Sequence, residues 1–264
     1  MNNTFDLKRF GMLFKRHTIE HGKTYALSVG VLTGVLFLIL MFFSLTSKRH
    51  LRDDTQIIVF IFTMAAAGSI FGSIIFADLG DRTKAIPSLM LPASHFEKYL
   101  VGLIYSYFIF VLVFVGAFYL TDTIVVNISE HELAEDKVIN IFDPHGKPAV
   151  AYMLFTLFHA FIFWGAIFFK KLHFIKTAIV FFLCLGVAML INVFILNKML
   201  STYTQFNVSI PFDRVSIIDI NSNNYFIGVV RATEKIEDYG KVIFVICVLL
   251  FWTSAYFRLK EKEV

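Results

Sequence analysis

The feature that most constrains this chain is a series of six apolar stretches of membrane-spanning length. They lie at about 25–45, 57–76, 99–120, 150–169, 177–196 and 242–257. A helix rises about 1.5 Å per residue and needs about 20 apolar residues to cross about 30 Å of hydrocarbon. Since lipid offers no partners to backbone polar groups, such stretches must bond internally as helices. We therefore predict an all-α polytopic membrane protein with six transmembrane helices.

The composition excludes a water-soluble alternative. Of the 264 residues, 57% are hydrophobic and 32 are phenylalanine, and the mean hydropathy is +0.71. Soluble domains are only about 45–50% apolar, even when glycine is counted. A soluble globule of this composition would leave large apolar patches in water, whereas lipid accepts the same side chains.

The Lys and Arg residues predict that both termini are cytoplasmic, in the cell inner (plasma) membrane. The inner segments, 1–24, 77–98, 170–176 and 258–264, hold 14 Lys and Arg in 60 residues, and the outer segments, 46–56, 121–148 and 197–241, hold 10 in 84. Positive charge near span ends is retained on the cytoplasmic side. Because these basic residues are spread over many segments, they form no patch of the kind that nucleic acid requires.

Two parts outside the spans have patterns of their own. Segment 1–24 places Phe10, Leu13 and Phe14 on one helical face with basic residues around it, which predicts a helix in the inner membrane interface, although a solvated tail is the alternative. The two long outer segments predict a small extracytoplasmic cap. Within the second of them, 206–210 and 215–220 alternate as half-buried strands do.

No complete catalytic, cofactor or metal motif is found. His17, Glu20 and His21 match the H-x-x-E-H pattern of inverted zinc proteases. A zinc site needs a third protein ligand and a dry cleft, so we interpret this match as chance on an amphipathic helix. The sequence contains no P-loop, and we predict neither an enzyme nor a bound cofactor.

Polar residues inside the spans are few, whereas small residues recur at helix-packing spacing. His159 and Asn192 are the candidates for lining a pathway, although each more often bonds a neighbouring helix. No Asp, Glu, Lys or Arg lies inside a predicted span, which argues against transport driven by protons or sodium ions. Two pairs of glycines have helix-packing spacing, 30 with 34 and 68 with 72, and ordinary packing within the chain is favoured over a dimer face.

The inner loop 77–98 is the most informative segment. Ser94 and Glu97 have the spacing of a capping box, which predicts that the third span starts there. Pro92 stops a helix from continuing out of the preceding residues. The run 84–91 is apolar but too short to span the membrane, which suits a short helix that docks into a partner protein.

The string Leu89-Met90-Leu91-Pro92-Ala93-Ser94 with Glu97-Lys98, placed between spans two and three, resembles permease subunits of bacterial type-2 ABC exporters. The resemblance implies six spans, an interfacial helix before the first, a coupling helix in the first inner loop and an enlarged outer segment after span five. The chain has a candidate for each. The outer segment 121–148 is longer than this layout implies.

The resemblance implies an ATP-driven exporter whose pathway is built by two permease chains, as a homodimer or heterodimer, in membrane lipid. ATP hydrolysis would belong to a separate cytoplasmic ABC ATPase subunit. The coupling-loop contacts would be Arg82, Lys84, Ile86, Leu89 and Met90. The alternatives are a stand-alone transporter or channel and a non-transporting membrane anchor or assembly protein; nothing in the sequence selects a substrate.

Overall fold

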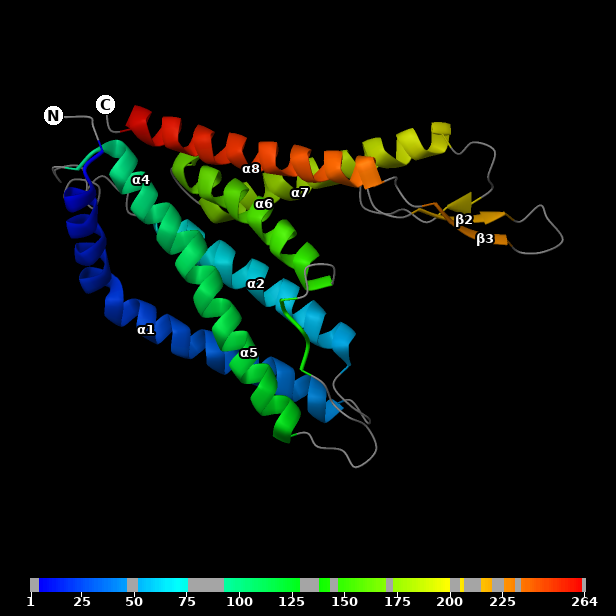
Figure 1. Ribbon diagram of the computed structural model, residues 1–264, viewed down its shortest axis with the longest axis horizontal. Helices are drawn as coiled ribbons and strands as arrows, with labels where there is room; N and C mark the ends of the chain where they lie inside the picture. Colours follow the sequence, from blue (N-terminus) through cyan, green and yellow to red (C-terminus); the bar gives the residue numbers. More distant parts are fainter. Residues whose placement is uncertain are drawn as a thin grey trace. The chain divides into compact units, whose positions relative to one another are not determined.

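The computed structural model confirms an all-α polytopic membrane protein (Figure 1). It describes residues 5–46, 52–75, 93–128, 138–142, 147–169, 173–199, 205–206, 215–219, 226–230 and 234–262. Within these residues, 6 helices are long and apolar enough to cross a membrane. The chain forms two compact units, 1–174 with 251–264 and 175–250, and each is described by itself.

The first unit holds most of the helices. They are α1 (Leu7–Thr46), α2 (Asp53–Ile75), α4 (His95–Leu103), the π-helix η2 (Ile104–Ile109), α5 (Phe110–Ile128), α6 (Lys147–Phe168) and the last part of α8 (Glu234–Lys262). The elements α4, η2 and α5 follow each other without a break and make one candidate span. The predicted stretches 25–45 and 99–120 lie wholly within α1 and the α4, η2 and α5 series, and the described parts of 57–76 and 150–169 lie almost entirely on α2 and α6.

The second unit contains most of α7 (His173–Met199), the first part of α8 and a small sheet. Its strands β1 (Gln205–Phe206), β2 (Val215–Asp219) and β3 (Phe226–Val230) are antiparallel in the order β1-β2-β3. Strand β2 lies where the sequence predicts a strand, and β1 overlaps the start of the other predicted strand, whose residues 207–210 lie outside the described residues. Strand β3 was not predicted, because its short run with a central glycine has no clear alternation.

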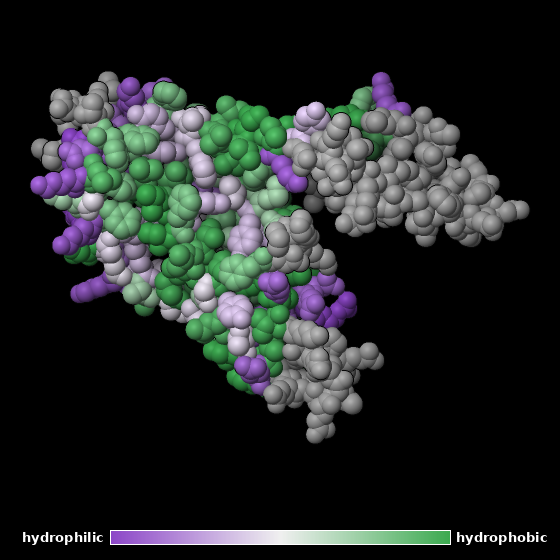
Figure 2. All heavy atoms as spheres, viewed as in Figure 1, coloured by the Kyte–Doolittle hydropathy of each residue, from purple (hydrophilic) through white to green (hydrophobic). Residues whose placement is uncertain are grey.

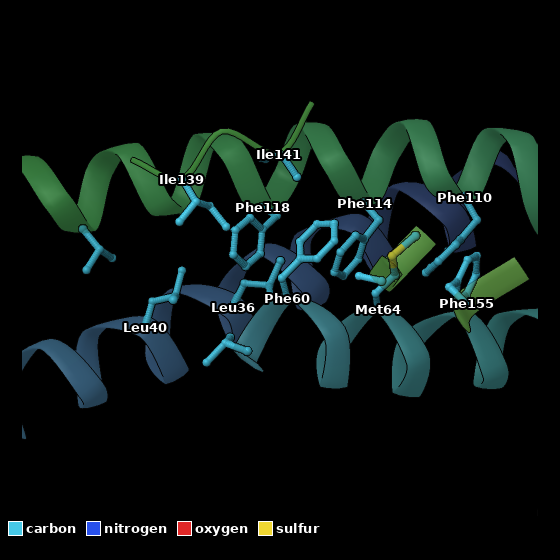
Figure 3. Packing of buried hydrophobic residues seen from close by; sticks show 13 residues of the cluster. Leu36, Leu40, Phe60, Met64, Phe110, Phe114, Phe118, Ile139, Ile141 and Phe155 are labelled. Carbon is cyan, nitrogen blue, oxygen red and sulfur yellow. The ribbon is translucent and has the colours of Figure 1, made fainter. Parts of the chain in front are cut away.

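The core of the first unit is an aromatic layer between α5 and α2 (Figure 3). Phe114 and Phe118, on the same face of α5, point toward Phe60 of α2, with ring centroids 5.5 and 4.9 Å away. Ile139 and Ile141 from the segment 138–142 are buried in the same layer. Part of the predicted outer cap therefore packs into this helix bundle.

The outer surface of the helices is largely apolar, as contact with lipid requires. Figure 2 shows hydrophobic side chains over most of the helical surface in this view, with the most polar ones gathered mainly near helix ends. Many large hydrophobic side chains are exposed, among them Phe62 and Leu112, whose exposed fractions are 71% and 75%. In water such a surface would promote association, so the surface agrees with the candidate spans.

The first helix is continuous from the polar lead into the first apolar stretch, and Figure 1 shows it changing direction after its first turns. The predicted aromatic face of the lead is turned toward the protein. The Phe14 ring lies 4.9 Å from that of Tyr105 in η2, and the Phe10 ring lies 5.8 Å from Phe5. An interfacial position for this lead stays a prediction, but its aromatic face packs on other side chains.

One glycine pair serves packing within the chain, as predicted. A Cβ atom added to Gly68 would lie 2.3 Å from Phe155 of α6 and 2.8 Å from Phe110 of α5. Only a residue without a side chain permits this approach of α2 to its neighbours. For Gly30 and Gly34 the same added atom meets nothing within 4 Å among the described residues, so no such contact accounts for that pair.

Replacing Gly68 by alanine should therefore destabilise the bundle. Phe155 and Phe110 would have to shift, at a cost of about 1–3 kcal/mol for overpacking. The measurement is the thermal unfolding of the protein purified in detergent, with Gly116→Ala as the control because its added Cβ meets nothing within 4 Å. Equal melting temperatures for the two variants would contradict this packing.

Candidate functional site: a buried ion pair at the start of α4

The helix α4 begins with the predicted capping box. The amide of Glu97 donates to Ser94 Oγ at 3.2 Å, and the amide of Ser94 donates to Glu97 Oε2 at 2.9 Å. Two backbone amides that the first turn leaves without helical partners are thereby satisfied. The capping role predicted for these two residues is confirmed.

The same carboxylate also holds the start of α1. Arg9 Nη2 donates to Glu97 Oε1 at 2.7 Å, and Arg9 Nε donates to Oε2 at 2.8 Å, which makes a bidentate pair. The backbone amide of Asp6 donates to Oε1 at 2.9 Å, while Asp6 Oδ1 accepts from the amide of Lys8. Glu97 therefore lies where two helices begin, and each positive helix start favours a negative charge there.

This environment keeps Glu97 ionised although its side chain is fully buried. The carboxylate precedes the apolar stretch 99–120, and the side chain of Arg9 is 27% exposed. The hydrogen bonds that the carboxylate accepts from Arg9 and from the backbone amides of Asp6 and Ser94 offset the cost of burying its charge. The result is a directional ionic contact between α1 and α4.

A stripe of side chains continues the contact along α1. Phe14, His17, His21 and Tyr25 follow each other at helical spacing, and three of these rings pack on Tyr105 of η2, with centroid distances of 4.9, 4.5 and 5.6 Å for Phe14, His17 and Tyr25. His17 Nε2 lies 2.8 Å from the hydroxyl of Tyr25. The lead of α1 is thus fixed against the π-helix by rings and hydrogen bonds.

The H-x-x-E-H pattern has a packing explanation. Its two imidazole rings have centroids 4.6 Å apart and are tilted by 48° to one another, because residues four apart share a helix face. Glu20 forms an ion pair with Arg16 at 2.7 Å on an exposed face. Among the described residues, no group of three His, Cys, Asp or Glu side chains is placed to hold a metal ion.

The π-helix η2 presents two tyrosines to different neighbours. Tyr105 contacts the stripe on α1 and bonds the hydroxyl of Thr18, whereas Tyr107 bonds Thr156 of α6 at 2.7 Å. Short π-helical segments are frequent at functional sites. Sequence reasoning did not find this element, because no residue pattern in 104–109 distinguishes it from an ordinary helix.

The two predicted pathway residues lie in different units. His159 of α6 is buried, with rings of Tyr107, Phe155 and Phe163 around it. Asn192 lies on α7, with intermediate exposure. The structure therefore describes an aromatic surrounding for His159, and a pathway role for either residue stays a prediction.

A buried ionisable residue was missed. Asp122 lies on α5 beyond the predicted end of the third span, and it is fully buried. The helix continues to Ile128, and Val125 and Val126 follow at helical spacing on the buried side. That periodicity was the available signal that the helix, and the candidate span on it, continues past residue 120 and includes this acidic residue.

The predicted partner contacts in the inner loop, Arg82, Lys84, Ile86, Leu89 and Met90, lie outside the described residues. The described chain resumes at Ala93, directly before the capping box. The capping box of Ser94 and Glu97 and the ion pair of Glu97 with Arg9 are therefore among the described contacts that follow these loop residues most directly in sequence.

The fold and this site define a polytopic membrane protein in which a buried ion pair fastens the first helix to the start of the third candidate span. Comparisons of the chain with protein-family models, with curated proteins and with solved structures give no match.

Replacing Arg9 by methionine should leave the Glu97 carboxylate buried without its cation. Removing the cation from a buried carboxylate destabilises a fold, so the melting temperature of the purified variant should fall clearly below that of the wild type. Arg16→Met is the matched control, because the exposed pair of Arg16 with Glu20 contributes about 0.5 kcal/mol or less.

The double variant Arg9→Met with Glu97→Gln should recover part of the loss, since it no longer buries an unpaired charge. An Arg9→Met variant as stable as Arg16→Met would show that the pair contributes little.

Proposed function

We propose that this chain is the membrane-spanning permease subunit of an ATP-driven ABC exporter, with a separate cytoplasmic ATPase subunit and a second permease chain as partners. The single observation that carries the proposal is the buried Glu97, which begins α4 directly after the inner loop and pairs with Arg9 of α1. Six candidate spans and the resemblance of segment 89–98 add support.

A force that acts on the inner loop can move the helices only if a stiff connection joins this loop to the bundle. A short apolar loop segment bound by an ATPase would move when ATP closes the ATPase pair. The capping box ties the end of this loop to the first turn of α4, and the bidentate pair passes displacement of that turn to α1. Tyr105 then links the same motion to the stripe on α1.

The proposed orientation places the loop 77–98 and both termini in the cytoplasm, because Lys and Arg are denser in those segments. Labelling tests this orientation in intact cells, in a background in which Cys184 and Cys247 are alanine. A membrane-impermeant maleimide should label Ser222→Cys and should leave Lys262→Cys unlabelled until the cells are opened. The reverse pattern would overturn the orientation.

Alanine replacement of the five loop residues Arg82, Lys84, Ile86, Leu89 and Met90 tests the function. A co-expressed ATPase should lose binding to the permease, and ATP hydrolysis stimulated by the permease should fall by about tenfold or more. Membrane insertion should be unchanged, because these residues lie outside the predicted spans.

The matched control removes charge elsewhere on the proposed cytoplasmic side, with Arg16→Ala and Lys23→Ala, and should retain the ATPase. If the loop variant keeps a bound and fully active ATPase, the coupling proposal fails. A chain that binds no ATPase in any form would instead favour the membrane anchor.

A further inference from the structure

Buried polar atoms without partners lie against the ring of Tyr107. Neither ring nitrogen of His159 is hydrogen-bonded within the described part of the chain, and the same holds for Trp252 Nε1. The rings of His159 and Trp252 lie 5.2 and 5.6 Å from that of Tyr107. Proteins rarely leave buried polar groups unpaired, so each needs a partner of some kind.

The side chains around His159 are already satisfied or apolar. The hydroxyl of Thr156 donates to the carbonyl of Tyr152 at 2.7 Å and accepts from the hydroxyl of Tyr107 at 2.7 Å. The other ring neighbours are Phe155 and Phe163, which offer no conventional hydrogen-bonding group. A partner for His159 must therefore come from outside this set.

Gly72 leaves space beside one of the ring nitrogens. A Cβ atom added to Gly72 would lie 3.6 Å from Cδ2 and 3.7 Å from Nε2 of His159, which are ordinary contact distances. The same atom added to Gly68, one turn earlier on α2, would lie only 2.3 Å from Phe155. Helix α2 is thus tightly packed at Gly68 and has room for a methyl-sized group at Gly72.

We propose that His159 and the space at Gly72 form a binding site for one neutral hydroxyl group. A neutral imidazole has one N–H donor and one acceptor nitrogen, and a hydroxyl group can both donate and accept. The described ring contacts of His159 are all uncharged, so a neutral group suits the site better than an ion. Because the space admits only a methyl-sized group, the hydroxyl belongs to a water molecule, and the site stands whether or not the chain transports anything.

The test is a double-mutant cycle read by the melting temperature in detergent. If a hydroxyl occupies the space, Gly72→Ala should lower the melting temperature by several degrees, because the methyl group displaces the partner of His159. In a His159→Phe background the same change should be neutral or stabilising, since it adds a good helix former to an apolar space. Gly68→Ala, the matched control, should destabilise both backgrounds.

A Gly72→Ala variant that is as stable as the wild type, or that is equally destabilised in both backgrounds, would overturn the proposal. If His159→Phe does not fold, the ¹⁵N resonances of the His159 ring provide the second measurement. The Nε2 resonance should shift between the wild type and Gly72→Ala, and unchanged spectra would also overturn the site.

Discussion

The arrangement of the first unit depends on one fully buried carboxylate. Glu97 receives hydrogen bonds from an arginine side chain and from backbone amides at the starts of two helices. A buried charge is tolerated only when it is paired and hydrogen-bonded, so the lead of α1 and the first turn of α4 must stay together. The stripe of rings on α1 and the position of Tyr105 follow from that fixed starting point.

A second constraint comes from aromatic volume. Phe60, Phe114 and Phe118 fill the layer between α2 and α5, and Gly68 permits Phe155 to approach the backbone of α2. Between helices in lipid the hydrophobic effect offers little drive, so close packing and hydrogen bonds must hold them. Large rings set against glycine supply the packing, and Tyr107 with Thr156 supplies one of the hydrogen bonds.

Features that depend on neighbouring residues could be predicted from the sequence, whereas contacts between residues far apart in the chain could not. The spans follow from apolar length, and the capping box follows from the three-residue separation of Ser94 and Glu97. The pairing of Arg9 with Glu97 joins residues 88 positions apart, and no local pattern marks that partner. Asp122 was placed in a loop because hydropathy fell before the helix ended.

The glycine contact on α2 also limits which parts of the bundle can move. A ring wedged against a helix backbone does not slide or rotate without leaving its contact, so α2 and α6 should behave as one rigid body at Gly68 and Phe155. The glycines of α1 have no comparable neighbour among the described residues. A conformational change in this unit would therefore leave the α2 and α6 pair as a fixed frame.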